Sequence, residues 1–478
     1  MNYRVILNVL GTVIKFLGIS LLVPLLVAFY YNEQESIRIF LVSSIFAILT
    51  GLVLEYTCKS EFDLLHRESF VIVAMGWFSA AVFGAVPFLL SGIPPIDSLF
   101  ESMAGFTTTG STILMDIESH SRSLLFWRSM TQWLGGMGII VLVIAILPRL
   151  AVAGRQMFNS EAPGPIKDKL KPRLKDTAQI LWGVYVTFTV LEIILLKYAG
   201  MSLYDAVVHS FSTMATGGFS PNNESIAGFG SVLIEAIIIV FMLVAGANFT
   251  LMYKTLRIDV KSIFKDKEFQ GYLSIILLAT LVISFELWNW GETLFDSVRY
   301  AIFQVVAVMT TTGFASTDFN LWPDSTKMIL LLLMFVGGSA GSTGGAMKVI
   351  RVLLLVKFGL REIQKSIHPK IVKPIRIGEN VIPDEVMQAV LSFFVLYLLV
   401  FVLSSFILSV LGLDMITSIS ASATTLGNVG PGLNLIGPMA NFSAIPFIGK
   451  IVLILNMWIG RLEVLTVLIL FVPSFWKK

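Results

Sequence analysis

Ten long apolar stretches constrain what this chain can fold into more than any other feature. Crossing the hydrocarbon core of a bilayer takes about 20 mostly apolar residues in a helix. The stretches are Val5–Tyr30, Ile37–Tyr56, Ser69–Leu90, Leu124–Leu147, Ala178–Leu196, Val232–Tyr253, Tyr272–Trp290, Met328–Lys357, Val386–Leu411 and Pro446–Val472. Only 14% of the 478 residues are charged, whereas a soluble domain carries about 25%. We therefore predict an all-α polytopic membrane protein, and exclude a soluble enzyme, a disordered chain and a nucleic-acid-binding protein.

Positive charge is distributed unequally between alternate connections of these stretches. Residues 149–175, 254–267 and 348–376 are rich in lysine and arginine, and the chain ends in Lys477 and Lys478. The intervening connections, 92–123, 200–231, 291–327 and 412–445, contain only Arg122, Arg299 and Lys327. Because positive charge is retained on the cytoplasmic side, both termini are predicted to be cytoplasmic. The basic connections would also suit a cytosolic partner or anionic lipid, and the spacing of charges does not separate these interpretations.

The reactive residue types do not form an enzyme-like or metal-binding pattern. The single cysteine, Cys58, allows no internal disulfide. Four scattered histidines give no zinc-type cluster. We find no Ser/His/Asp constellation and therefore expect a protein that is not an enzyme.

Each connection on the outward side contains a short helix-like stretch followed by threonine and glycine. The first leads from Asp97 to Thr107-Thr108-Thr109-Gly110. The same order recurs in Met214-Ala215-Thr216-Gly217, Thr310-Thr311-Thr312-Gly313 and Ala423-Thr424-Thr425-Leu426-Gly427-Asn428. A stretch of about 10–12 residues is too short to cross the membrane, and β-branched residues and glycine are poor helix formers. We therefore predict four segments that enter the membrane and turn back, in four copies of span, short helix, glycine turn and span.

Four such segments from one chain would meet at a pseudo-fourfold axis and form a pore. Extended backbone inside a membrane is tolerated only where it is buried in protein or lines a water-filled cavity. Rings of backbone carbonyls replace the hydration shell of a cation, whereas divalent pores use rings of carboxylates, which are missing from these four positions. We predict a filter for a dehydrated monovalent cation, lined by Thr108, Thr109, Gly110, Ala215, Thr216, Gly217, Thr311, Thr312, Gly313, Thr425, Leu426, Gly427 and Asn428.

The repeats divide the chain into five predicted units. Residues 1–58 form an N-terminal two-helix pair that precedes the repeats. The four pore repeats are predicted at residues 69–150, 176–255, 270–358 and 384–473.

The four filters and the extra helix pair resemble the superfamily of potassium transporters that includes bacterial Trk and Ktr and plant HKT proteins. The resemblance covers the whole chain, and the two additional N-terminal spans are most similar to Trk membrane subunits. It implies K⁺ as the permeant ion, because glycine in all four filters goes with potassium preference in this superfamily. Leu426, before Gly427, departs from the Thr-Thr-Gly pattern, which would loosen the selectivity.

The same resemblance implies a location and partners. These are the bacterial inner membrane, a homodimer, and a ring of cytosolic nucleotide-binding regulatory subunits that are TrkA-like. Nucleotide (ATP or NAD) would then act only through that partner, and no covalent cofactor is implied.

A glycine-rich run interrupts the eighth apolar stretch. Residues 337–345 contain five glycines, each of which costs a helix interior about 1 kcal/mol relative to alanine. Gly345 is followed by Ala346 rather than lysine, which argues against a phosphate-binding loop. In the superfamily the matching stretch is an intramembrane loop that obstructs the pore. We therefore predict a gate formed by Gly337, Gly338, Ser339, Gly341, Ser342, Thr343, Gly344 and Gly345, the alternative being a passive kink.

Arg461 lies near the middle of the last apolar stretch. A charge at that depth costs at least about 2.5–3.5 kcal/mol, so its side chain must face the interior of the bundle. The resemblance places it in the conduction path, where its positive charge would oppose cations. The alternative is a structural contact with a carboxylate or with carbonyl groups.

The leading hypothesis is potassium uptake by gated, channel-like permeation under control of a cytosolic subunit. The re-entrant segments are all on the outward side, whereas alternating-access transporters show inverted repeats. Two alternatives stay open at this point: a proton- or sodium-coupled potassium symporter, and a Ktr-type subunit permeable to both K⁺ and Na⁺.

Overall fold

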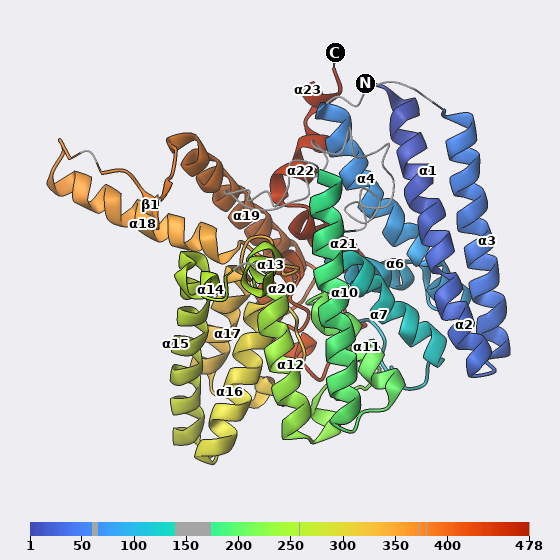
Figure 1. Cartoon of the computed structure of the whole chain (residues 1–478), viewed down its shortest axis with the longest axis horizontal. Helices are drawn as coiled ribbons and strands as arrows, with labels where there is room; N and C mark the ends of the chain where they lie inside the picture. Colours follow the sequence, from blue (N-terminus) through green and yellow to red (C-terminus); the bar gives the residue numbers. More distant parts are fainter. Residues whose placement is uncertain (60–65, 139–173, 258, 372, 379, 478) are drawn as a thin grey trace.

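The chain folds into a bundle of helices, as predicted for an all-α membrane protein (Figure 1). The structure, a computed structural model, describes all residues except 60–65, 139–173, 258, 372, 379 and 478. The described residues contain one small antiparallel hairpin, β1 (Arg376–Ile377) with β2 (Asn380–Val381). Both ends of the chain lie close together at one end of the bundle (Figure 1), where Arg67 Nη1 donates a hydrogen bond to Lys477 O over 2.9 Å.

Long, short and broken helices follow one another in a regular order along the chain. The long helices are α1 (Tyr3–Ser20), α3 (Gln34–Thr57), α4 (His66–Gly84), α10 (Leu174–Tyr198), α15 (Lys267–Trp290) and α19 (Asp384–Val410). Four short helices follow α4, α10, α15 and α19, namely α6 (Pro95–Phe106), α11 (Leu203–Met214), α16 (Leu294–Met309) and α20 (Met415–Gly427). The next helices are α7 (Arg122–Gly136), α12 (Val232–Ala245) with α13 (Phe249–Arg257), α17 (Asp324–Val336) with α18 (Val349–Ile367), and α21 (Phe447–Arg461) with α22 (Val464–Leu468). The remaining helices are α2 (Leu22–Tyr30), α5 (Val86–Leu90), α14 (Ser262–Lys265), α23 (Pro473–Trp476) and the 3-10 turns Ala227–Phe229, Phe319–Leu321, Asn434–Ile436 and Ile469–Phe471.

Six helices in the described residues are long and apolar enough to cross a membrane, or up to eight if each of two bent pairs is one span. These eight coincide with eight of the ten predicted stretches. Of the two others, Met328–Lys357 is wrong as a continuous span, because residues 337–348 separate α17 from α18 and α18 runs sideways out of the bundle (Figure 1). The other, Leu124–Leu147, is helical to Gly136, and its last part lies outside the described residues.

The N-terminal pair is held together by close helix contact. α1 packs along α3, and Cβ atoms added at Gly11 and Gly51 would each lie under 3 Å from the backbone of the opposite helix. Small residues permit this approach inside a membrane, where dispersion contacts rather than water exclusion drive helix association. Lys15, which interrupts the first apolar stretch, pairs with Glu55 of α3 at 2.5 Å between Nζ and Oε2.

The last helix of each group breaks or ends half-way. α12 and α13 meet at a bend of 102°, and α21 and α22 at 118°. α7 ends at Gly136, and α17 ends at Val336. Only the break at residues 337–345 was predicted from the sequence.

The helix groups close into a ring. α7 packs on α11, α12 on α16, α17 on α20, and α21 on α6. The helix that follows each short helix thus packs on the short helix of the next group, and α21 of the last group packs on α6 of the first. This arrangement is the four-repeat fold predicted from the sequence, although the boundaries of the individual units stay predictions.

Candidate functional site

The four short helices are positioned by their termini. Ser202, Thr293 and Asp414 cap α11, α16 and α20 by accepting a hydrogen bond from the backbone N–H three residues further on. α6 instead has proline in its first turn, where the missing N–H costs nothing. With 12 to 16 residues, the helices are about 18–24 Å long, which is shorter than the hydrocarbon core of about 30 Å.

One or two residues after each short helix comes a residue in the left-handed region. The φ angles are +53° for Thr108 and Thr216, +61° for Thr311 and +54° for Asn428. Two residues later comes a glycine in the same half of the φ range, with +80° at Gly110, +76° at Gly218, +78° at Gly313 and +112° at Gly430. The conformation recurs in all four repeats although the sequences TTTG, ATGG, TTTG and GNVG differ.

These four glycines form a closed ring of contacts. A Cβ added at Gly110 would overlap the carbonyl oxygen of Gly217, one at Gly218 that of Thr312, and one at Gly313 that of Val429. At Gly430 the added Cβ would lie 2.9 Å from Thr109 O, which returns the ring to the first repeat. Any side chain at these positions would therefore collide with the main chain of the adjacent repeat.

The structure corrects the alignment of two repeats. The sequence pattern predicted that Gly110, Gly217, Gly313 and Gly427 are equivalent, whereas the φ angles make Gly218 and Gly430 the equivalents of Gly110 and Gly313. Hydrogen bonds agree, because Thr109 N, Gly217 N, Thr312 N and Val429 N each bond the carbonyl five residues earlier. Gly217 therefore matches Thr109, and Gly427 lies at the end of α20, where it matches Thr107.

The other predicted filter residues occupy different levels of the same region. Thr108, Thr216, Thr311 and Asn428 are equivalent, as are Thr109, Gly217, Thr312 and Val429. Ala215 follows α11 directly, whereas Thr425 and Leu426 lie within α20 and not in the extended segment. Gly218, Val429 and Gly430, which were not predicted from the sequence, lie in this region as well. The shared pairs Gly218-Phe219 and Gly313-Phe314 would have given the second repeat its register.

Side chains behind the extended segments fix their main chain. Gln132 of α7 donates from Nε2 to Gly217 O over 2.7 Å and accepts at Oε1 from Phe219 N over 3.1 Å. Asn428 donates from Nδ2 to Thr109 Oγ1 over 2.9 Å and so links the fourth repeat to the first.

Two oxygen atoms at the left-handed level have no protein partner. Thr108 Oγ1 and Asn428 Oδ1 are buried, and neither has a hydrogen-bond partner in the described residues. Leaving a buried polar atom unsatisfied costs about 1–3 kcal/mol. These atoms are therefore suited to bind something other than the protein.

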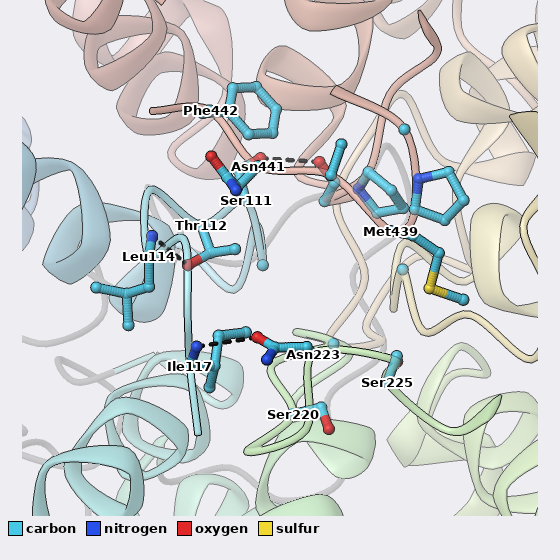
Figure 2. A pocket seen from close by; sticks show the side chains of 18 of the residues that line it. Ser111, Thr112, Leu114, Ile117, Ser220, Asn223, Ser225, Met439, Asn441 and Phe442 are labelled. Carbon is cyan, nitrogen blue, oxygen red and sulfur yellow. Dashed lines mark hydrogen bonds between the residues drawn. The ribbon is translucent and has the colours of Figure 1, made fainter. Parts of the chain in front are cut away.

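A cavity of about 100 Å³ opens on the side of the glycine ring opposite the left-handed residues (Figure 2). All four glycines, Gly110, Gly218, Gly313 and Gly430, line it. Figure 2 shows that its walls come from segments far apart in the chain, joined by contacts such as Ile117 N to Asn223 Oδ1 at 2.9 Å. The glycine ring is thus reached from this side through a polar mouth.

The glycine-rich run 337–345 lies against the opposite side of the ring. Gly345 N donates to Thr311 Oγ1 over 2.7 Å. Thr343 Oγ1 lies 3.1 Å from both Met214 O and Ala245 O, and Ser339 N donates to Gly246 O over 2.8 Å. The run therefore contacts the inner ends of the second and third repeats and the break between α12 and α13.

Arg461 joins this run to two other repeats. Its Nη1 donates to Thr343 O over 2.7 Å, and its Nη2 donates to Gly135 O over 2.7 Å and to Gly136 O over 2.9 Å. Its guanidinium also lies 5.6 Å from the ring centre of Trp77. Arg461 thus faces the interior, where these main-chain carbonyls accept its hydrogen bonds.

The fold and the site together define a membrane protein of four re-entrant repeats around one central ring, and this architecture belongs to cation transport proteins. Residues 36–478 match the family model described as "TrkH: Cation transport protein". The chain is 40% identical to the Trk system potassium uptake protein TrkH of Salmonella typhimurium and 36% identical to TrkG of Escherichia coli K12, over 100% of this chain and 100% and 99% of those proteins.

A solved structure agrees. The crystal structure of the potassium transporter TrkH from Vibrio parahaemolyticus superposes with a TM-score of 0.89 at 37% identity, and both chains are covered completely. The chain therefore belongs to the TrkH family, a family of transporters and not of enzymes, and the resemblance found in the sequence is confirmed.

Proposed function

We propose that this chain takes up K⁺ across the bacterial inner membrane by gated, channel-like permeation. The observation that carries the proposal is the closed ring in which Gly110, Gly218, Gly313 and Gly430 each face a carbonyl oxygen of the next repeat. Carbonyl rings of this kind substitute for the hydration shell of a cation. The relatives named as potassium uptake proteins support K⁺ as that cation.

The filter consists of the main chain of Thr109, Gly217, Thr312 and Val429, the glycines that follow them, and the residues one level below. Thr108 Oγ1 and Asn428 Oδ1 are oxygen ligands that a dehydrated cation would find unoccupied by hydrogen bonds. The short helices end at this level, so their C-terminal carbonyl dipoles favour positive charge there.

The gate is the run 337–345 together with Arg461. The run obstructs the path because it hydrogen-bonds Thr311, in the filter, and the inner end of α11. Arg461 holds it through Thr343 O and adds a positive charge below the filter, which opposes a cation. Opening requires these contacts to break.

The orientation in the membrane is proposed from the distribution of positive charge, and the partners are proposed from the family. Both termini lie at the same end of the bundle (Figure 1), and the basic connections favour the cytoplasm for that end. The relatives are named as parts of a Trk system, which supports a partner in general terms. The homodimer and the cytosolic TrkA-like subunits, through which alone nucleotide would act, are proposed from the family resemblance. Inward K⁺ flux would be driven by the membrane potential, about 2.3 kcal/mol per charge per 100 mV.

The test is cation flux into liposomes that contain only the full-length chain. We expect K⁺ and Rb⁺ to enter well above Na⁺ and Li⁺, and the rate to follow an imposed potential. Because a closed gate would silence the wild type, Arg461→Ala is measured beside it. If neither protein carries flux until a proton or sodium gradient is supplied, channel-like permeation is overturned in favour of a coupled transporter.

A further inference from the structure

A buried ion pair lies directly behind the outer half of the glycine ring. Arg128 of α7 and Glu101 of α6 are joined over 2.5 Å between Nε and Oε1, and their side chains are 2% and 0% exposed. Neither residue was singled out from the sequence, because they are 27 positions apart and belong to different helices.

Glu101 fixes the segment that follows the first filter glycine. Its carboxylate accepts from Thr112 Oγ1 at 2.9 Å and from Ile113 N at 3.0 Å. Thr112 and Ile113 come two and three residues after Gly110. The carboxylate therefore determines how the first extended segment leaves the ring.

Arg128 does the same for the second repeat. Its Nη1 donates to Ser220 O over 2.8 Å, and its guanidinium lies 3.6 Å from the ring centre of Phe219. Phe219 and Ser220 directly follow Gly218. One planar guanidinium thus binds Glu101 and the second extended segment at the same time, which the single ammonium of a lysine cannot reproduce.

The four repeats differ at this place. Glu101 lies nine residues before its filter glycine, and the equivalent residues are His209, Gln304 and Ala421. His209 Nε2 lies 3.1 Å from Ser220 Oγ, and Gln304 Nε2 reaches Ser316 Oγ only at 3.4 Å. Among these four positions the first alone is an acid. At this level an ion pair therefore links the extended segments of the first and second repeats, and the other repeats have no acid at the equivalent position.

Arg128 also acts on the mouth. It lines the same outer cavity as Gly110, Gly218, Gly313 and Gly430. A cation entering this mouth would meet the guanidinium charge unless a carboxylate balanced it, and Glu101 is the group in contact. The pair therefore has an electrostatic effect as well as a geometric one.

We propose that Glu101 and Arg128 are positioning residues that set cation selectivity and cation affinity at the outer half of the filter. The proposal rests on the proposed function. Stability alone is a weak explanation for the pair, because well-packed apolar residues of similar volume commonly replace a buried ion pair without loss of stability.

The experiment compares full-length variants in liposomes by two readouts, the K⁺/Na⁺ permeability ratio and the K⁺ concentration at half-maximal uptake. Arg128→Lys keeps the charge but loses the planar guanidinium that binds Glu101 and the second extended segment together. The K⁺/Na⁺ permeability ratio should therefore fall at least about threefold, and the half-maximal K⁺ concentration should not change. Glu101→Gln leaves the guanidinium unbalanced at the mouth, so the ratio should fall and the half-maximal concentration should rise, each at least about threefold.

The chain offers a matched control. Arg299 and Glu235 also join neighbouring groups, α16 and α12, with 2.7 Å between Nε and Oε2. The other charged and aromatic contacts of Arg299 are with Asp296 and Tyr300, away from the ring. Arg299→Lys and Glu235→Gln should leave both readouts at the wild-type values.

Two outcomes separate this proposal from the proposed function. If the wild type and Arg461→Ala carry no selective K⁺ flux, the proposed function fails. If the wild type is selective and Arg128→Lys and Glu101→Gln match it in both readouts, the ion-pair proposal alone is overturned. Should either variant fold poorly, the apolar pair Glu101→Met with Arg128→Leu is used. We expect it to melt near the wild-type temperature and to lose selectivity, and wild-type selectivity in it would also overturn the proposal.

Discussion

The outer and inner halves of the central path are built in different ways. The outer half consists of four equivalent segments, each with a left-handed residue and a glycine that faces the next repeat. The inner half is asymmetric, because one repeat supplies the run 337–345 and another supplies Arg461. Repetition suits a ring that must be similar from all sides, whereas a single inserted loop suits an obstruction that has to move. We therefore expect outer substitutions to change selectivity and inner substitutions to change flux.

The largest effect is expected in the outer half. Gly313→Ala places a Cβ on the Val429 carbonyl at a φ of +78°, and strain of this kind costs about 1–3 kcal/mol even before the overlap. K⁺ uptake and the K⁺/Na⁺ ratio should each fall about tenfold or more, measured as tracer flux. Gly183→Ala is the control, because a Cβ at Gly183 meets nothing within 4 Å. Wild-type uptake and selectivity in Gly313→Ala would show that the glycine ring does not determine selectivity.

The second-largest effect is expected in the inner half, where a substitution should raise K⁺ flux instead of lowering it. Arg461→Ala removes three hydrogen bonds to main-chain carbonyls and one positive charge from the proposed gate. Basal K⁺ flux should rise about tenfold, as expected for losing about 1.4 kcal/mol or more from the closed state, with the K⁺/Na⁺ ratio unchanged. Arg461→Lys retains the charge, so its basal K⁺ flux should lie between those of the wild type and Arg461→Ala. Lower or unaltered flux in Arg461→Ala would argue against the gate.

A smaller effect of the same kind is expected at Thr343. Thr343→Val removes the hydroxyl that lies 3.1 Å from Met214 O and Ala245 O while nearly preserving the shape. A hydrogen bond of this kind contributes about 0.5–1.5 kcal/mol, so basal flux should rise about two- to tenfold. Electrical recording of the same liposome preparation would show a changed selectivity if, contrary to this account, Thr343 belonged to the filter.

The smallest effect is expected outside both halves. Lys15 and Glu55 pair within the N-terminal helices, and their side chains are 30% and 23% exposed. Lys15→Met leaves the Glu55 carboxylate without this partner inside the helix pair, so it should lower the free energy of unfolding, whereas flux and selectivity should stay as they are. A thermal melt together with the flux assay checks this, and altered selectivity would show that the helix pair influences the ring.

The sequence predicted the short helices, the glycine turns and the run 337–345, because each follows from local composition. It did not predict the register of the second and fourth repeats. Adjacent glycines at 217 and 218 fit the turn equally well, and Leu426-Gly427 imitates a Thr-Gly pair although it lies inside α20. Only the contact of each glycine with the next repeat decides between them.

The helix breaks at Gly246 and Leu462 were missed for a related reason. Each interrupts an apolar run for only two or three residues, and such breaks are tolerated in membrane helices wherever neighbours satisfy the freed backbone groups. Here Ser339 N supplies that partner to Gly246 O, and it comes from a segment 93 positions away in the chain. A long-range contact of this kind leaves no local signal.

The most direct test of the central claim is to locate the permeant ion. We would determine the structure of the full-length chain with Tl⁺ or Rb⁺ in place of K⁺ and map the anomalous signal. We expect a peak inside the ring formed by the main chain of Thr109, Gly217, Thr312 and Val429, and we expect Gly313→Ala to lose it. An ordered ring without a peak, or a peak only at another place in the protein, would contradict the claim.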